Sequence, residues 1–235
     1  RSNGHDLNVG FNYSDDTWMF NASLGVTPQK RTIDRKVGKL YADTTMRTID
    51  YQPMIWLSWR KKKMRVSLNY NGRTRQPSLS DLMPLTDNSD PLYITRGNPD
   101  LKQMFMHTMH VSFQHPSKGI SANLGWQMEK NSVTQVVLYD VQTGGREIYP
   151  ININGNWNTY GSADWWKRFG HFSLKLSTSG RHSNRVSMIN EDRSQQPEKS
   201  TTRDTGLNCE MAASYQPTWG GFDFSTSWDY QYSLN

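Results

Sequence analysis

The stretch ISANLGWQME, residues 120–129, alternates apolar and polar side chains without interruption. Successive side chains of a β-strand point to opposite faces of a sheet, so a period of two predicts a strand with one apolar and one polar face. No segment long enough to form a helix shows the apolar period of 3.6 residues that an amphipathic helix requires. The class predicted from this pattern is all-β. The apolar face of the quoted stretch carries Ile120, Ala122, Leu124, Trp126 and Met128.

The same alternation recurs on both sides of this stretch, and we count ten strands in five hairpins. The strand that begins at Ile120 is expected to continue to Tyr139, turn at residues 143–145 and return from Ile151. Asparagines alternate along the returning segment at residues 152–158; they either line a sugar pathway or fill a wet interior. The five hairpin turns are expected at Asp15, Lys62, Ser117, Arg168 and Thr218.

The connections between strands differ in length at the two edges of the predicted sheet. Turns within hairpins are short, whereas residues 28–50, 73–101 and 181–203 are expected to form long loops. Short turns on one edge and long loops on the other are typical of an outer-membrane β-barrel. Aromatic side chains gather beside the short turns, as a membrane-interface girdle requires. These aromatic residues are Trp18, Trp59, Trp165, Trp219 and Tyr215.

Composition restricts the remaining classes. The chain has 235 residues, an apolar fraction of 34%, an aromatic fraction of 12% and a formal net charge of +6. The aromatic content argues against disorder, and the single cysteine, Cys209, excludes an internal disulfide. No apolar run is long enough for a membrane-spanning helix, and no signal peptide opens the chain. The basic segment at residues 60–65 is interpreted as a hydrated turn rather than a nucleic-acid site.

Cofactor and metal chemistry find no support in the sequence. His107 and His110 are three positions apart in a predicted strand and therefore face opposite sides. No cluster of cysteine and histidine has zinc-site spacing. We therefore expect no metal and no cofactor.

The longest predicted loop, RTRQPSLSDLMPLTDNSDPLYITRGNPDL at residues 73–101, is expected to contain no regular structure because of its four prolines. It is nevertheless too apolar for a disordered linker, and long ordered loops are often functional. The candidate ligand contacts on the outer loops are Tyr41, Tyr93 and Arg96.

Short motifs occur in a fixed order along this loop and carry a family resemblance. They are RQPS at residues 75–78, LMP at 82–84, DNSDP at 87–91 and GNPDLK at 97–102. The set resembles the outer-membrane β-barrel domain of Bacteroidetes TonB-dependent receptor-like proteins. The motif residues expected to make turns or start strands are Arg75, Pro77, Asp87, Asp90, Pro91, Gly97, Asn98, Pro99 and Leu101.

The resemblance implies an antiparallel up-and-down transmembrane β-barrel of about 22 strands, much larger than the ten strands counted. Residues 1–235 are therefore expected to form a single partial barrel region, without a plug domain, a signal peptide or the final barrel strand. Both ends of the region are expected on the outer side of the membrane.

The function implied by the resemblance is ligand uptake or binding at the outer membrane of a Gram-negative bacterium. Its expected partners are outer-membrane lipid, an unidentified ligand and a TonB-type energising protein acting through the absent plug, with no nucleic acid and no catalytic activity. Two alternatives stay open: a soluble extracytoplasmic all-β module that binds carbohydrate or another polymer, and a small outer-membrane barrel enzyme. The enzyme would use residues at the outer strand ends, namely Asp87, Asp90, Asp140, His107 and His182.

Overall fold

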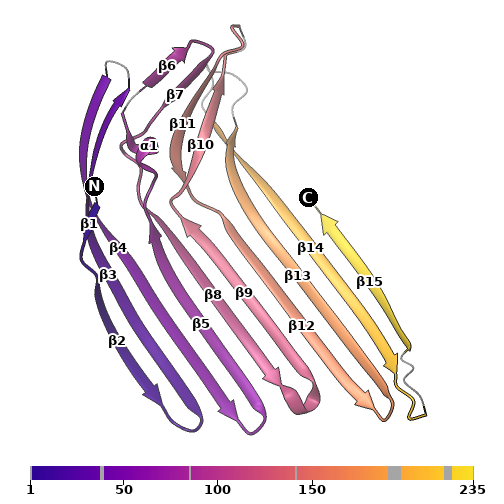
Figure 1. The fold of residues 1–235 in the computed structure, drawn as a ribbon. Coiled ribbons are helices and arrows are strands. Elements are labelled where there is room, and N and C mark those ends of the chain that lie inside the picture. The colour runs from indigo at the N-terminus through magenta and orange to yellow at the C-terminus, as the bar shows by residue number, and fades with distance from the viewer. Residues whose placement is uncertain are drawn as a thin grey trace.

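The computed structural model describes residues 2–37, 40–84, 86–140, 142–189, 197–219 and 224–234, and it is built almost wholly of β-strands. Eleven strands form one antiparallel main sheet, in which β1 and β2 both pair with β3 (Figure 1). The ten-strand meander predicted from alternation is confirmed, and β1 is a short addition to it. The strands of the main sheet are β1 Ser2–Gly4, β2 Leu7–Ser14, β3 Trp18–Val37, β4 Leu40–Lys61, β5 Met64–Arg75, β8 Met104–His115, β9 Ile120–Lys130, β12 Trp157–Phe169, β13 Phe172–Ile189, β14 Glu198–Tyr215 and β15 Phe224–Leu234.

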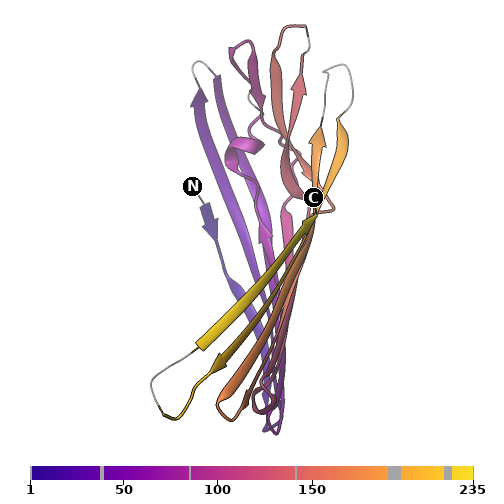
Figure 2. The ribbon, with the colours of Figure 1, turned by 90° about the vertical axis from the view of Figure 1, so that its right-hand side faces the viewer.

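The main sheet is open and twisted. Across the described residues β2 pairs only with β3 and β15 only with β14, so the meander does not close on itself. Seen from the side, the C-terminal strands cross the N-terminal ones at an angle (Figure 2), which is the twist expected of paired strands. An open sheet of this kind fits a part of a larger barrel.

One face of the main sheet is apolar and uncovered. Side chains near the N-terminal edge are the most exposed, with Val9 at 77%, Leu7 at 63% and Phe11 at 60% of their full surface. The strand pairing carries this face across the sheet, because Ala122 of β9 lies opposite Ala163 of β12, which lies opposite Thr178 of β13. A barrel presents such a face to lipid and keeps its polar face inside.

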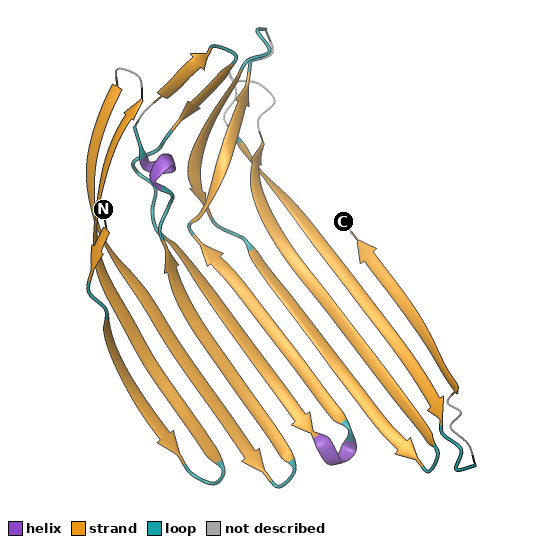
Figure 3. Ribbon diagram, viewed as in Figure 1, coloured by secondary structure: helices purple, strands orange, loops and turns teal. Residues whose placement is uncertain are grey.

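The described short turns between successive strands lie at one end of the main sheet (Figure 3). Asp15 closes the β2–β3 turn by accepting hydrogen bonds from the backbone amides of Thr17 and Trp18. The β8–β9 turn is a short helix, η1 Pro116–Lys118. Trp18 and Trp59 face each other across β3 and β4, with ring centres 6.3 Å apart.

Two of the predicted long loops are wrong. Residues 28–50 continue β3 to Val37 and begin β4 at Leu40, and the two strands pair along their whole length. Likewise, β13 runs to Ile189 and β14 begins at Glu198, inside the loop predicted at residues 181–203. Apolar alternation is needed only where one face meets lipid or a core. These extensions have charged and polar residues on both faces, so their sequence resembles a loop.

The predicted continuous strand from Ile120 to Tyr139 is also wrong, because the chain leaves the main sheet at Asn131. Asn131 and Gly155 have positive φ angles of 57° and 120°, conformations that interrupt a regular ladder. Beyond this break, β10 Ser132–Tyr139 and β11 Arg146–Ile153 pair with each other as a separate hairpin, whose turn at residues 143–145 is as predicted.

Asparagine side chains hold the break together. Asn152 donates to the carbonyl oxygens of Lys102 and Asn131 and accepts from the Lys102 amide at 2.7 Å. Asn154 accepts from the amide of Asn131, and Asn156 accepts from that of Val186. The side chains of these three asparagines, Asn152, Asn154 and Asn156, therefore stabilise the break by hydrogen bonds to the backbone of neighbouring segments. Their hydrogen bonds give no support to a sugar pathway.

The most buried apolar side chains lie above the break and not within the main sheet. Leu82, Met83, Leu101, Val136 and Ile153 are each at most 6% exposed. They come from the 73–101 segment and from the β10–β11 hairpin, so these two segments form a small core at the outer end of the sheet. No helix in the described part of the chain is long and apolar enough to cross a membrane.

Candidate ligand-facing site on the outer loops

The 73–101 segment contains regular structure, contrary to the prediction. It forms one helical turn, α1 Leu79–Leu82, and two strands, β6 Thr86–Asp90 and β7 Tyr93–Arg96. The prolines stand between these elements: Pro77 precedes α1, Pro84 follows it, and Pro91 lies in the β6–β7 turn. Each element is only four or five residues long. The prolines therefore set the ends of the elements without preventing them.

Strand β7 joins this segment to the β10–β11 hairpin. It pairs in parallel with β11, with Tyr93 opposite Arg146 and Thr95 opposite Ile148. The result is a four-stranded sheet in the order β10-β11-β7-β6, which we call the upper sheet (Figure 1). Ordered strand pairing thus fixes the outer end of the barrel segment.

The GNP motif connects the upper sheet to α1. A side chain at Gly97 would lie 2.8 Å from the carbonyl carbon of Met83, so only glycine fits. The next residue, Asn98, donates its backbone amide to the Asp81 carbonyl and its side-chain amide to the Pro150 carbonyl at 3.0 Å. These contacts hold three separate segments together.

The other motif residues occupy turns or packed positions. Asp87 accepts from Ser89, and Asp90 accepts from the amide of Leu92, which shapes the β6–β7 turn. Pro77 and Leu101 are buried, Arg75 ends β5, and Pro91 and Pro99 are exposed. Their geometry is that of turn and packing residues.

The structure does not bring the candidate contacts Tyr93 and Arg96 together. They lie three positions apart on β7 and therefore point to opposite faces of the upper sheet. Arg96 forms an ion pair with Glu147, 2.8 Å from Nε to Oε1, and its guanidinium lies over the Tyr149 ring. The third candidate, Tyr41, falls within β4, but its side chain lies outside the described residues.

Tyr93 belongs to a row of three residues on the more exposed face of the upper sheet. The Arg146 guanidinium lies 4.4 Å from the centre of the Tyr93 ring. On its other side, Arg146 lies opposite Tyr139 of β10. Tyr93 and Tyr139 are 39% and 48% exposed. We call Tyr93, Arg146 and Tyr139 the Tyr–Arg–Tyr row; it exposes two aromatic rings and one positive charge to solvent.

Sequence reasoning missed Arg146 and Tyr139. The turn at residues 143–145 places these two residues opposite each other in a hairpin and was a usable signal. Their proximity to Tyr93 depends on the parallel pairing of β7 with β11, and no local pattern indicates it.

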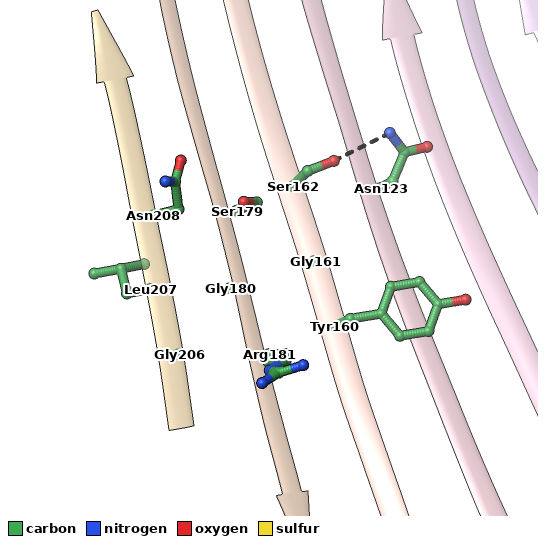
Figure 4. A pocket seen from close by; sticks show the side chains of 10 residues that line it. All are labelled: Asn123, Tyr160, Gly161, Ser162, Ser179, Gly180, Arg181, Gly206, Leu207 and Asn208. Atoms are coloured by element: carbon green, nitrogen blue, oxygen red, sulfur yellow. Dashed lines mark hydrogen bonds between the residues drawn. The ribbon is translucent and has the colours of Figure 1, made fainter. Parts of the chain in front are cut away.

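A second polar feature lies on the main sheet. An open hollow of about 720 Å³ spans β9, β12, β13 and β14, and the side chains of Tyr160, Arg181 and Asn208 line its polar face (Figure 4). The Tyr160 ring packs directly over Gly125. A Cβ atom added at Gly125 would lie 2.6 Å from the Tyr160 Cε1 atom, so the ring occupies the space of the missing side chain. A hydrogen bond joins Asn123 to Ser162 across β9 and β12 (Figure 4). This polar face would line the interior of a barrel.

The residues considered for the enzyme alternative are separate in the structure. His107 bonds to Tyr70, His182 bonds to Thr205, and Asp140 accepts from the amides of the β10–β11 turn. Within the described residues, no group of three or more histidine, cysteine, aspartate or glutamate side chains is placed to hold a metal. That alternative requires a closed ten-strand barrel, but within the described strands the first and last strands of the meander do not pair with each other.

Comparison with known proteins gives a family match and several similar solved structures, among them the following two. The chain is 10% identical to the siderophore receptor PirA of Pseudomonas aeruginosa, covering 99% of this chain and 57% of that one with a TM-score of 0.46. It is 11% identical to the outer membrane transporter YddB of Escherichia coli, covering 99% of this chain and 34% of that one with a TM-score of 0.43. The chain thus spans only part of either protein. No curated protein sequence matches it.

The family model for the outer membrane protein beta-barrel family matches residues 45–234, which is most of the chain. The match agrees with the all-β meander, the uncovered apolar face and the aromatic residues at the turn end. The chain therefore belongs to the outer membrane protein beta-barrel family and lies in the outer membrane of a Gram-negative bacterium.

Proposed function

We propose that the barrel containing this chain is a receptor that binds a ligand at the cell surface and takes it up across the outer membrane. In this proposal a TonB-type partner supplies the energy through a plug domain elsewhere in the protein. The observation that carries the proposal is the upper sheet, because it presents the Tyr–Arg–Tyr row to the outside in a fixed geometry.

The geometry also suits a route from the surface inward. The polar face of the main sheet lies below the upper sheet and carries Arg181, Tyr160 and Asn208 around an open hollow. The three groups offer a positive charge, an aromatic ring and an amide to a polar ligand passing the wall. The proposal includes no catalytic role.

The alternatives have less support. A soluble carbohydrate-binding module would bury its apolar face, yet Val9, Leu7 and Phe11 remain exposed. The family match also favours the membrane barrel.

The proposal is tested with the full-length gene in its own bacterium. A deletion strain is complemented with wild type or with Arg146→Ala, and growth is measured on ferric chelates, oligosaccharides or peptides as the limiting nutrient. We expect one nutrient class to require the gene and to be used poorly by Arg146→Ala. Arg65→Ala, which removes an exposed arginine at the turn end of β5, is the matched control and should grow as wild type.

Energy dependence is tested in the same strains by removing the TonB-type protein. Growth that requires the gene but not the energiser would contradict the energised mechanism. Equal growth of the deletion and wild-type strains on every nutrient class would contradict uptake altogether.

A further inference from the structure

A basic hollow lies at the turn end of the main sheet, between η1 and the last residues of β12. Its volume is about 520 Å³, and Lys118, Lys167 and Arg168 line it together with Trp165 and Trp166. No acidic side chain lines it among the residues that the structure describes. We call this feature the basic hollow.

The cations of the basic hollow are available to an anion. Lys118 and Lys167 are exposed, and neither forms an ion pair in the described part of the chain. The Lys167 ammonium lies 4.9 Å from the centre of the Phe169 ring. Arg168 is held in place by hydrogen bonds from its guanidinium to the Gly170 carbonyl and the Gln216 side chain, 3.1 Å each. Lys167 lies on the apolar face of β12 together with Trp165, whereas Arg168, the next residue of the strand, points to the polar face. In the described part of the chain, the cations without an ion pair that are left to bind an anion at this opening are therefore Lys118 and Lys167.

An apolar groove begins where the basic hollow ends. The groove has a volume of about 580 Å³ and runs over the apolar face of β9, β12, β13 and β14. Ile120 and Trp165 line both features, so the groove and the hollow are continuous. Farther along, the apolar side chains Leu176 and Met211 line the groove.

We propose that the basic hollow and the apolar groove together bind one anionic glycerophospholipid of the periplasmic leaflet. The short turns of an outer-membrane barrel lie on the periplasmic side. The headgroup phosphate enters the basic hollow, which is complementary to it in charge, and one acyl chain lies in the groove. Tryptophan at the junction suits the boundary between headgroup and hydrocarbon. This proposal depends on the membrane-facing surface and not on the transported ligand.

The test uses the full-length protein, purified in detergent, stripped of lipid and then offered phosphatidylglycerol or phosphatidylethanolamine. Bound lipid is counted by native mass spectrometry. We expect one phosphatidylglycerol to be retained in preference to phosphatidylethanolamine. Each juxtamembrane cation contributes about fivefold to the affinity for an anionic lipid. The double variant Lys118→Gln/Lys167→Gln should therefore bind phosphatidylglycerol roughly 25-fold more weakly.

Two further variants separate the lipid site from simpler explanations. Lys62→Gln/Lys63→Gln removes the same charge from the β4–β5 turn and should leave lipid retention unchanged. Ala163→Leu narrows the groove and should weaken phosphatidylglycerol binding while leaving Lys118 and Lys167 in place. Each variant must first be shown to be folded, by the difference in its SDS-gel mobility between unheated and heated samples.

Three results would overturn the lipid site. Equal losses of phosphatidylglycerol binding in Lys118→Gln/Lys167→Gln and in Lys62→Gln/Lys63→Gln would mean that the lipid is held by general charge attraction. Full retention in Ala163→Leu would mean that the groove holds no acyl chain. Displacement of phosphatidylglycerol by millimolar inorganic phosphate would mean that the basic hollow is only a phosphate site.

Discussion

Gly97 gives the sharpest test of how the upper sheet is held. A methyl group at this position would lie 2.8 Å from the Met83 carbonyl carbon and 3.0 Å from the Asp81 carbonyl oxygen, and closer still to the Met83 oxygen. These are backbone atoms, so no side chain can rotate away to make room. In Gly97→Ala, α1 must therefore move away from residues 97 and 98.

The expected cost follows from the contacts that are lost. Inserting a methyl group into a packed site costs about 1–3 kcal/mol. Separating the two segments also breaks the hydrogen bond from the Asn98 amide to the Asp81 carbonyl, worth about 1 kcal/mol. The total of about 2–4 kcal/mol lowers the free energy of local opening of the upper sheet. Amide exchange in β6 and β7 should then accelerate by roughly 30-fold or more.

Hydrogen exchange followed by mass spectrometry measures this opening in the folded, full-length protein. Gly144→Ala is the matched control, since Gly144 lies in the β10–β11 turn with no atom within 4 Å of an added methyl group. Because Gly144 has a φ of 70°, alanine at this position is strained by about 1 kcal/mol, but its methyl group contacts no other atom. Equal exchange rates in β6 and β7 for Gly97→Ala and wild type would refute the reasoning.

Three further predictions concern stability in the main sheet and at the break. Asn152→Ala removes three hydrogen bonds to residues 102 and 131 and should lower the free energy of unfolding, measured by urea titration in detergent, by about 2–4 kcal/mol; an unchanged midpoint would contradict the bracing role. Tyr160→Ala and Gly125→Ala should couple by about 1 kcal/mol in a double-mutant cycle, because the ring covers the glycine; additive losses would argue against this contact. At the β2–β3 turn, hydrogen bonds from the Trp18 amide, the Tyr13 hydroxyl and the Thr17 amide lower the pKa of Asp15 from its ordinary value of 3.8. The stabilisation by the Asp15 carboxylate is therefore complete above that value and lost as the pH falls through the lowered pKa, so the stability difference between wild type and Asp15→Asn should shrink in acid.

Alternation was sufficient to predict the main sheet. Residues 120–129 place apolar and polar side chains on opposite faces, and the same alternation predicted the ten strands of the meander. The prediction failed where that alternation is absent. Residues 28–37 and 40–50 belong to paired strands. The sequence there carries charged and polar residues at successive positions, so no apolar period of two marks it as a strand.

The candidate site was only partly predictable. Tyr93 and Arg96 were chosen for their place in the longest loop, but the two-residue period of β7 sends them to opposite faces. Arg146 and Tyr139 were missed, since their partner Tyr93 is more than forty positions away along the chain. Strand pairing over such a distance leaves no trace in local composition.

The sequence by itself determined the all-β class of the protein and the alternation of its polar and apolar faces. These two properties depend on the local order of polar and apolar residues, strand by strand. The outer membrane followed from the family motifs and the family match rather than from that order. Only the tertiary structure decided that the strands break at Asn131 and Gly155 and that the 73–101 segment joins the β10–β11 hairpin as the upper sheet. That outcome depends on long-range hydrogen bonds, such as that from Asn98 to Pro150, and on burial of side chains such as Leu82 and Val136, which are covered only after the chain has folded.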